Sequence, residues 1–234
     1  RTSGVAVGMG KRLNWPDPYF TLYGEAQYRH YGLNNWDYFI MKDGSANEIS
    51  LKLAFGRSTV NQPIFPREGS DFSINVAATP PVSLWDGKDY SDESMSDQDR
   101  YRWIEYHRWE LRGRWFQSLT RDSKLVLMAH AEMGYLGHYN KHKQSPFQRF
   151  DVGGDGMSGY SYNYATDMVA LRGYENGSLT PYGYEGYAYT RLGLELRFPF
   201  MLQNSTTIYG LAFVEGGNAW TDVSKFNLFD LKRS

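Results

Sequence analysis

The chain has 234 residues, 41% of them hydrophobic and 22% charged, so it is too apolar for a disordered protein and long enough for one large domain. Its formal net charge of -1 argues against nucleic acid or another polyanion as a partner. It contains no cysteine, which excludes disulfides, thiolate catalysis and thiolate zinc sites. No apolar run approaches the roughly 18 residues of a membrane helix, so any membrane crossing would use strands.

Tyrosine and glycine are unusually frequent, with 19 and 24 copies, and aromatic residues make up 17% of the chain. Aromatic side chains favour strands and membrane interfaces, whereas glycine serves turns and tight packing. The composition therefore indicates β structure.

Apolar and polar residues alternate with a period of two along much of the chain, which predicts about eight strands. In residues 124–139, for example, Leu127 and Ala129 fall on one face, while His130 and Glu132 fall on the other. In chain order the alternating segments are residues 2–13, 19–30, 47–57, 71–79, 109–116, 124–139, 186–200 and 206–217. Several reach the roughly 9 to 11 residues that cross a bilayer, longer than strands of a soluble sandwich.

The connections between these segments alternate in length. The shorter or proline-bearing ones are residues 13–18, 59–70, 119–123 and 199–205, and the long ones are residues 34–47, 80–100 and 140–184. Short turns at one rim and long loops at the other are typical of an outer-membrane barrel. A soluble β-sandwich or sugar-binding barrel is the alternative, because both also alternate and carry aromatic residues.

No linker divides the chain, so residues 1–234 are expected to form one domain. Eight strands close only a small barrel, whose interior is filled by side chains. A long loop folded inward would need a larger barrel. We therefore expect an incomplete transmembrane antiparallel β-barrel domain, with further strands outside this sequence.

Two short motifs stand out against this pattern. The stretch Leu171 to Tyr174 reads LRGY and places one arginine in a long polar segment without strand or helix period. In the stretch FVEGG, alternation puts Phe213, Glu215 and Gly217 on one face, with glycines that leave space beside the acid. A carboxylate with space around it favours a cation as its partner.

Both motifs resemble those of the outer-membrane assembly factor family, which comprises BamA and its relatives in two-partner secretion and translocation. LRGY is similar to the family's motif at the tip of a loop that folds into the barrel lumen, and FVEGG to its partner strand motif. Ile64 to Ser70, Ser145 to Gly154 and Glu195 to Pro199 also resemble family segments, in the same order. The join between Gly154 and Leu171 is longer than is usual in the family.

The resemblance implies a barrel of roughly sixteen strands, a long inward-folded loop and additional periplasmic repeat domains. It also implies an ion pair that locks the loop inside the lumen. The residues expected in this lumen lock are Leu171, Arg172, Gly173, Tyr174, Phe213, Glu215 and Gly217, and those expected at the loop entry are Gly153 and Gly154.

A guanidinium and a carboxylate can pair bidentately in a narrow lumen, and loss of one partner of a buried pair costs roughly 3–5 kcal/mol. We therefore expect removal of either charge to weaken the lock and a swap of the two charges to restore it. In the alternative arrangement Arg172 is a solvated loop residue, and Glu215 pairs with an inward neighbour such as Arg191 or Arg197.

By the same resemblance the protein lies in the cell outer membrane, is not an enzyme, needs no cofactor, and folds and inserts other outer-membrane proteins. Its implied partners are nascent outer-membrane proteins, periplasmic and lipoprotein subunits of an assembly complex, and membrane lipid. The alternatives are a two-partner secretion or translocation pore of the same superfamily and a general porin-like channel, which would lack the lock.

Other residue patterns favour structural explanations. His138 and His142 are four residues apart in an expected loop, which gives no zinc geometry, and the acidic residues 86–99 lack the ligand spacing of an EF-hand. Ser158 and Ser178 lie in no nucleophile elbow. Aromatic residues near strand ends are expected to form girdles at the two membrane interfaces: Trp15, Tyr19, Tyr28, Trp103, Trp109, Trp115 and Phe198.

Overall fold

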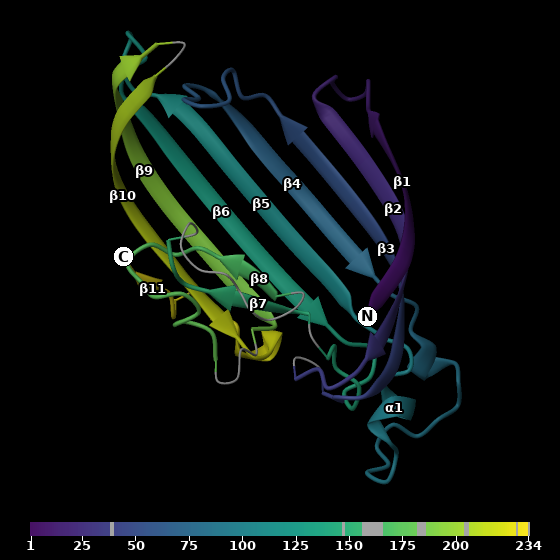
Figure 1. Ribbon diagram of the computed structural model, residues 1–234. Helices are drawn as coiled ribbons and strands as arrows, with labels where there is room; N and C mark the ends of the chain where they lie inside the picture. The colour runs from purple at the N-terminus through teal and green to yellow at the C-terminus, as the bar shows by residue number, and fades with distance from the viewer. Residues whose placement is uncertain are drawn as a thin grey trace.

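The computed structural model describes residues 1–37, 40–146, 148–155, 166–181, 186–203, 206–227 and 229–233. A nine-stranded antiparallel sheet dominates it, in the order β1-β2-β3-β4-β5-β6-β9-β10-β11 (Figure 1). The strands are β1 Thr2–Arg12, β2 Phe20–Leu33, β3 Gly44–Ser58, β4 Gly69–Ala78, β5 His107–Ser118, β6 Val126–Gly137, β9 Ala188–Leu202, β10 Thr207–Trp220 and β11 Lys232–Arg233. The eight long strands are those predicted from the alternation, and β11 adds two residues beside β10.

Two features of the fold were not predicted. The strands β7 Arg149–Val152 and β8 Thr166–Val169 form a separate parallel pair within the long segment between β6 and β9. One helical turn, α1 Asp97–Arg100, is capped by the Ser96 side chain, which accepts a hydrogen bond from the Asp99 amide. Elements of four residues are too short to show a period, so alternation does not reveal them. The short 3-10 turns Val82–Leu84 and Val223–Lys225 complete the structure.

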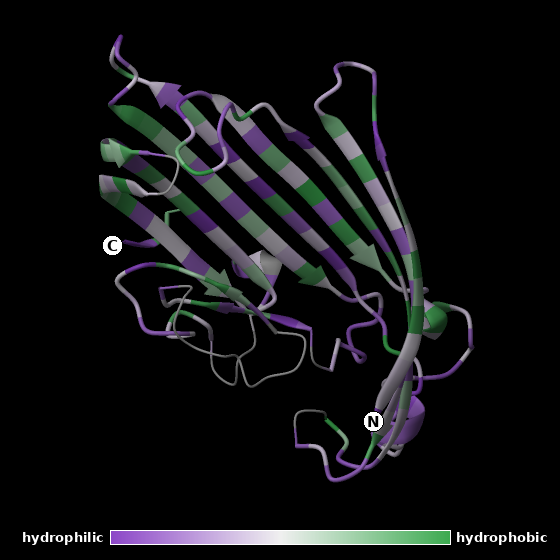
Figure 2. Ribbon diagram, turned by 45° about the horizontal axis from the view of Figure 1, so that its top comes forward, coloured by the Kyte–Doolittle hydropathy of each residue, from purple (hydrophilic) through white to green (hydrophobic). Residues whose placement is uncertain are grey.

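The alternation of the sequence separates an outer from an inner face of the sheet. Val7, Leu51 and Leu194 belong to the outer face, and each is about half exposed or more. Glu132, Arg191 and Glu215 are among the inner residues, where Arg191 contacts both acids. Figure 2 shows this alternation as green and purple bands along the strands. No described helix has the length and hydrophobicity needed to cross a membrane.

The two ends of the sheet differ, as the connector lengths predicted. Residues 13–19, 59–68, 119–125 and 203–206 join strands at one end, here called the short-turn end, at the top of Figure 1. Residues 34–43, 79–106 and 138–187 join them at the other, the long-loop end. Because β6 pairs directly with β9, the whole segment 138–187 is an excursion between neighbouring strands.

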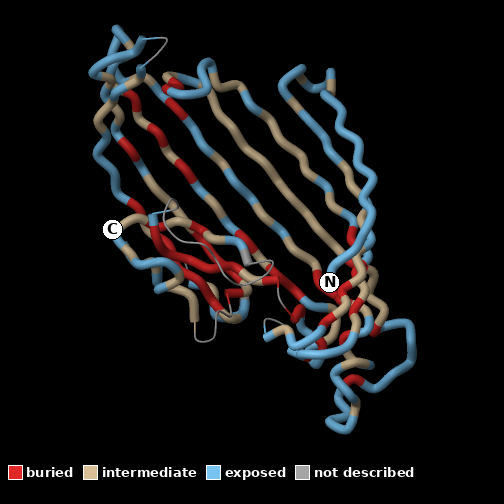
Figure 3. Tube along the Cα trace, viewed as in Figure 1, coloured by how far each residue is buried: buried red, intermediate tan, exposed pale blue. Residues whose placement is uncertain are grey.

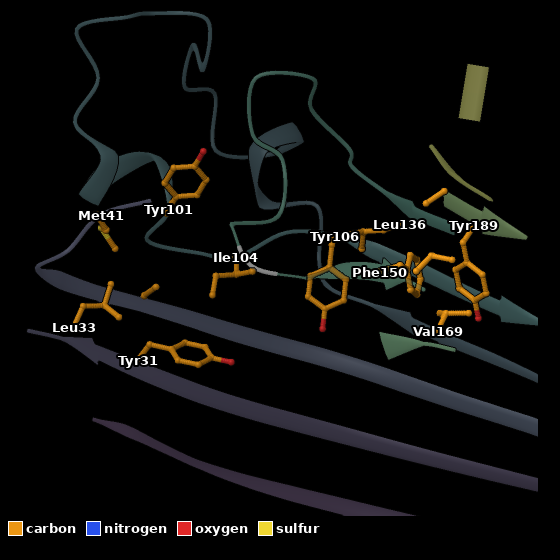
Figure 4. Packing of buried hydrophobic residues seen from close by; sticks show 13 residues of the cluster. Tyr31, Leu33, Met41, Tyr101, Ile104, Tyr106, Leu136, Phe150, Val169 and Tyr189 are labelled. Carbon is orange, nitrogen blue, oxygen red and sulfur yellow. The ribbon is translucent and has the colours of Figure 1, made fainter. Parts of the chain in front are cut away.

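The main core lies at the long-loop end, where the loops cover the inner face. It joins Tyr31 of β2 and Tyr106 of the loop before β5 to Phe150 and Val169 of the β7–β8 pair (Figure 4). Figure 3 shows that buried residues concentrate around β7 and β8, whereas much of the long strands is intermediate or exposed. The Phe150 and Tyr189 rings, 4.8 Å apart, pack β7 against the inner face of β9.

The predicted aromatic girdles remain a prediction. Trp15, Trp109 and Trp115 are exposed, as lipid-facing residues would be. Trp103 departs from the expectation, because it forms a bridge with Asn47 within the long-loop end.

Candidate functional site: a charged network beneath the inward loop

The entry to the inward loop packs directly against the LRGY segment. The Gly153 amide donates to the Val169 carbonyl, and the Gly154 amide donates to the Tyr174 carbonyl, both at 3.0 Å. The two glycines have φ values of +128° and +94°, and a Cβ on Gly153 would lie 2.3 Å from the Glu175 carbonyl oxygen. A side chain at Gly153 therefore conflicts with both the backbone conformation and the available space.

Leu171, Gly173 and Tyr174 of the motif make different contacts. The Leu171 side chain is fully buried and lies against Gly217, where an added Cβ would be 3.4 Å from both leucine methyl groups. Gly173 has a φ of +82°, which favours glycine, and thereby turns the chain. The Tyr174 hydroxyl donates to the carbonyl of Arg233 on β11 at 2.8 Å. The loop thus contacts β11 as well as β10, the strand that carries the acid partner.

Arg172 binds two carboxylates at once. Its backbone amide and Nε donate to Glu215 Oε2 at 3.2 and 3.1 Å, and its Nη2 lies 3.0 Å from Glu215 Oε1. The same Nη2 lies 2.5 Å from Glu195 Oε1. The guanidinium carbon is 3.7 Å from the centre of the Phe213 ring. Burial opposes the charge, but the two carboxylates outweigh it and raise the pKa of Arg172.

Glu215 is shared by several cations. Its side chain is 0% exposed, and besides Arg172 it accepts a hydrogen bond from Arg191 Nη2 at 2.6 Å. The His130 Nε2 atom lies 3.3 Å from Glu215 Oε1, close enough for an ion pair when the imidazole is protonated, although the angle does not make a hydrogen bond. A buried carboxylate without such partners would carry a large desolvation cost.

The contacts continue on both sides as an alternating row of charges. Arg191 Nη1 lies 3.2 Å from Glu132 on β6, and Arg197 Nη2 lies 2.6 Å from Glu195 on β9. We call this row the lumen network; its members are Glu132, Arg191, Glu215, Arg172, Glu195 and Arg197. It holds three acids and three arginines, so its formal charges balance. It can attach the loop firmly to the wall, since each charge has an opposite neighbour.

The structure contains the Arg172–Glu215 pair and, from the alternative arrangement, the contact of Glu215 with Arg191, while Arg172 is not a solvated loop residue. Arg172 contacts Glu215, and Arg191 contacts the same carboxylate. Arg197 instead pairs with Glu195. Glu195, the second partner of Arg172, was not among the partners expected from the sequence. Alternation already placed Glu195 on the polar face of its strand, but only the register, with Glu215 opposite Gly193, brings Arg191 and Glu195 to either side of the acid.

A second attachment ties the inward loop to β5. Arg108 on the inner face pairs with Asp167 of β8 and with Glu110 of its own strand. Its guanidinium carbon also lies 4.7 Å from the centre of the Phe150 ring. The β7–β8 pair is therefore held from β5, while Arg172 is held from β9 and β10.

A buried ion pair also joins two of the long loops. Lys143 Nζ lies 2.8 Å from Glu105, and both side chains are almost fully buried. The backbone and hydroxyl of Ser83 donate to the same carboxylate at 2.7 and 2.6 Å. Burial lowers the pKa of Lys143, and Glu105 opposes that shift. This cluster fixes the acidic loop to residues that follow β6.

The described residues contain no group of three or more histidine and acidic side chains arranged to hold a metal. Ser158 lies outside the described residues.

These features define a class of protein. Long antiparallel strands with an apolar outer face and a charged inner face, unequal connections at the two ends and a loop tied into the interior are those of a transmembrane β-barrel. A family model described as the Omp85 superfamily domain matches residues 1–234, and the chain belongs to that superfamily. The resemblance read from the motifs is thereby confirmed.

Comparison with solved structures supports the same fold. The chain is similar to the crystal structure of BamA from Haemophilus ducreyi lacking POTRA domains 1–3, with a TM-score of 0.65 and 18% sequence identity. The match covers 94% of this chain and 42% of that one, so the chain spans less than half of its structural relative. A search of curated proteins finds no significant match.

Proposed function

We propose that residues 1–234 are an incomplete barrel domain of an outer-membrane assembly factor, which folds and inserts other barrel proteins into the outer membrane without covalent chemistry. The observation that carries this proposal is the attachment of LRGY to the FVEGG strand through Arg172 and Glu215. A loop bound across the interior narrows the lumen, which favours a braced barrel over a wide open channel. Nascent outer-membrane proteins, periplasmic or lipoprotein subunits and lipid would be the partners.

The lumen network suggests what the loop contributes to this activity. Insertion by strand addition requires a sheet edge that can open and pair with an incoming strand. The rest of the wall must keep its shape while that edge moves. Arg172 of the loop, held by Glu195 of β9 and Glu215 of β10, and Arg108 of β5, which holds Asp167 of β8, would brace the wall and confine the movement to the edge.

A translocation pore of the same superfamily is the second candidate, because the same pair of motifs is expected in both. The two differ in what fails when the network is broken. An assembly factor would lose the delivery of many barrel proteins, whereas a translocation pore would lose the export of its own cargo.

The test uses the full-length gene with Arg172→Ala, Glu195→Ala or Glu215→Ala, and measures the amounts of other folded barrel proteins in the outer membrane. Arg114→Ala is the matched control, since Arg114 is also an inner-face arginine with one acidic partner, Asp71, but lies outside the network. We expect the first three variants to lower these amounts and the control to leave them unchanged. Unchanged amounts in all four, at equal levels of the variant proteins, would contradict an assembly role.

A further inference from the structure

We infer that the β3–β4 turn, residues 59–68, is a second closure of the lumen, in which Phe65 plugs the short-turn end and restricts the passage of small solutes. The inward loop covers the interior near the long-loop end, so this closure would act at the opposite mouth. It does not depend on whether the barrel inserts proteins or translocates them.

The burial of Phe65 is the first observation. Its side chain is 2% exposed and packs with Phe116 of β5 and with Val126 and Met128 of β6. These three residues alternate in phase with the charged inner-face residues of their strands, so Phe65 lies on the inner side of the sheet. The preceding residue, Ile64, is 66% exposed. A surface turn would not bury one aromatic ring among inner-face side chains.

The reach of the turn is the second observation. In the sheet, β4 is separated from β10 by β5, β6 and β9, which amounts to about 19 Å at the usual spacing between strands. Yet the Phe65 ring lies 5.4 Å from the ring of Tyr209 on β10. The turn therefore lies across the inner face of the sheet, over β5 and β6, and reaches as far as β10.

The turn is also built to hold this position. Thr59 and Ser70 close its base, with the Thr59 amide donating to the Ser70 carbonyl at 2.8 Å. The Ser118 hydroxyl donates to the Arg67 carbonyl at 3.0 Å and ties the turn to the end of β5. Gly69 has a φ of +103°, and a Cβ there would lie 2.4 Å from the Thr59 carbonyl oxygen. Glycine at this position permits the sharp return into β4.

Two of the rings that surround Phe65 contact Arg197 of the lumen network. The Arg197 guanidinium carbon lies 5.7 Å from the centre of the Phe116 ring and 5.9 Å from that of Tyr209, at distances typical of cation–π contacts. Arg197 also pairs with Glu195, a partner of Arg172. A row of side-chain contacts along the inner face thus links the inward loop to the residues around Phe65.

Cross-linking tests the position of the plug. Residues 1–234 contain no cysteine, so a pair can be introduced cleanly once any cysteine elsewhere in the full-length protein is replaced. We expect Phe65→Cys with Tyr209→Cys to react with a short thiol cross-linker in the folded protein. Ile64→Cys with Tyr209→Cys is the control, because Ile64 is its exposed neighbour. Equal or greater reaction of the control would overturn the proposal.

Conductance in planar bilayers tests the closure itself. We expect Phe65→Ala in the full-length protein to raise the single-channel conductance severalfold, while Phe65→Leu and Ile64→Ala leave it low. If Phe65→Ala does not fold, the double variant with Phe65→Cys and Tyr209→Cys tests the closure instead. With its two cysteines joined by a cleavable linker, the double variant should have a lower conductance than after the linker is cleaved. No change in conductance in either comparison would show that the turn does not close the lumen.

Discussion

The charge swap of Arg172 and Glu215 should fail to rescue the lumen lock, contrary to what the two motifs alone suggest. Each residue has a further charged neighbour in the network. A carboxylate at position 172 would face Glu195, which now lies 2.5 Å from the Arg172 guanidinium. A guanidinium at position 215 would face Arg191, whose Nη2 now lies 2.6 Å from the Glu215 carboxylate. One attraction would be kept at the cost of two new repulsions.

The expected magnitude follows from the contacts. Glu215→Ala removes the acceptor of three hydrogen bonds from Arg172 and one from Arg191. Breaking a buried pair costs roughly 3–5 kcal/mol, and the lower end applies because Glu195 and Glu132 still hold the two arginines. A loss of about 3 kcal/mol raises the unfolding equilibrium constant by roughly a hundredfold. Like charges at about 4 Å repel by about 4 kcal/mol at a protein-like dielectric, so the swap should be at least as unstable as the single variant.

The assay is urea unfolding of the full-length protein in lipid vesicles, followed by tryptophan fluorescence and by the mobility of the folded barrel on unheated gels. The matched control is a swap of Arg114 and Asp71, which pair with each other and with no further ion-pair partner among the described residues. We expect that control swap to be tolerated. If the Arg172 and Glu215 swap unfolds at the same urea concentration as the unchanged protein, the network argument is wrong.

Three further predictions concern the loops. Gly153→Ala should cost roughly 1–3 kcal/mol, because its φ is +128° and the new Cβ would meet a carbonyl oxygen, and should speed amide hydrogen exchange in the inward loop. Lys143→Ala should leave the buried Glu105 without its cation and speed protease cleavage of the acidic loop, whereas slow cleavage would mean that the pair adds little. Burial and neighbouring carboxylates raise the pKa values of Tyr90 and Tyr106, so both should keep their protons above about pH 10 while unfolded tyrosines lose theirs. Their contribution to the free energy of unfolding is therefore present below about pH 10 and is lost as the pH rises further. Tyrosinate absorbance should show the deprotonation of these two residues as a late step of the alkaline titration. That step should coincide with the onset of protease cleavage in the loops.

The strands and their two faces follow from the local order of residues along the chain. Alternation is a local property, because successive side chains of a strand point to opposite sides, so the eight long strands could be read in chain order. Connector lengths can also be read along the chain, and they distinguished the two ends of the sheet. The LRGY and FVEGG motifs identified Arg172 and Glu215 as candidate partners, and the structure places their side chains in contact.

Which other residues join this pair depends on contacts between distant segments of the chain. The register of β9 against β10 sets Arg191 and Glu195 on either side of Glu215, and no pattern in either strand specifies that alignment. The position of Phe65 against Tyr209 likewise depends on how far the whole sheet curves. Such contacts join segments far apart in the chain, and they are set by the sum of the strand pairings between them. A period read along the sequence records which face a residue occupies, but not which residue it meets there.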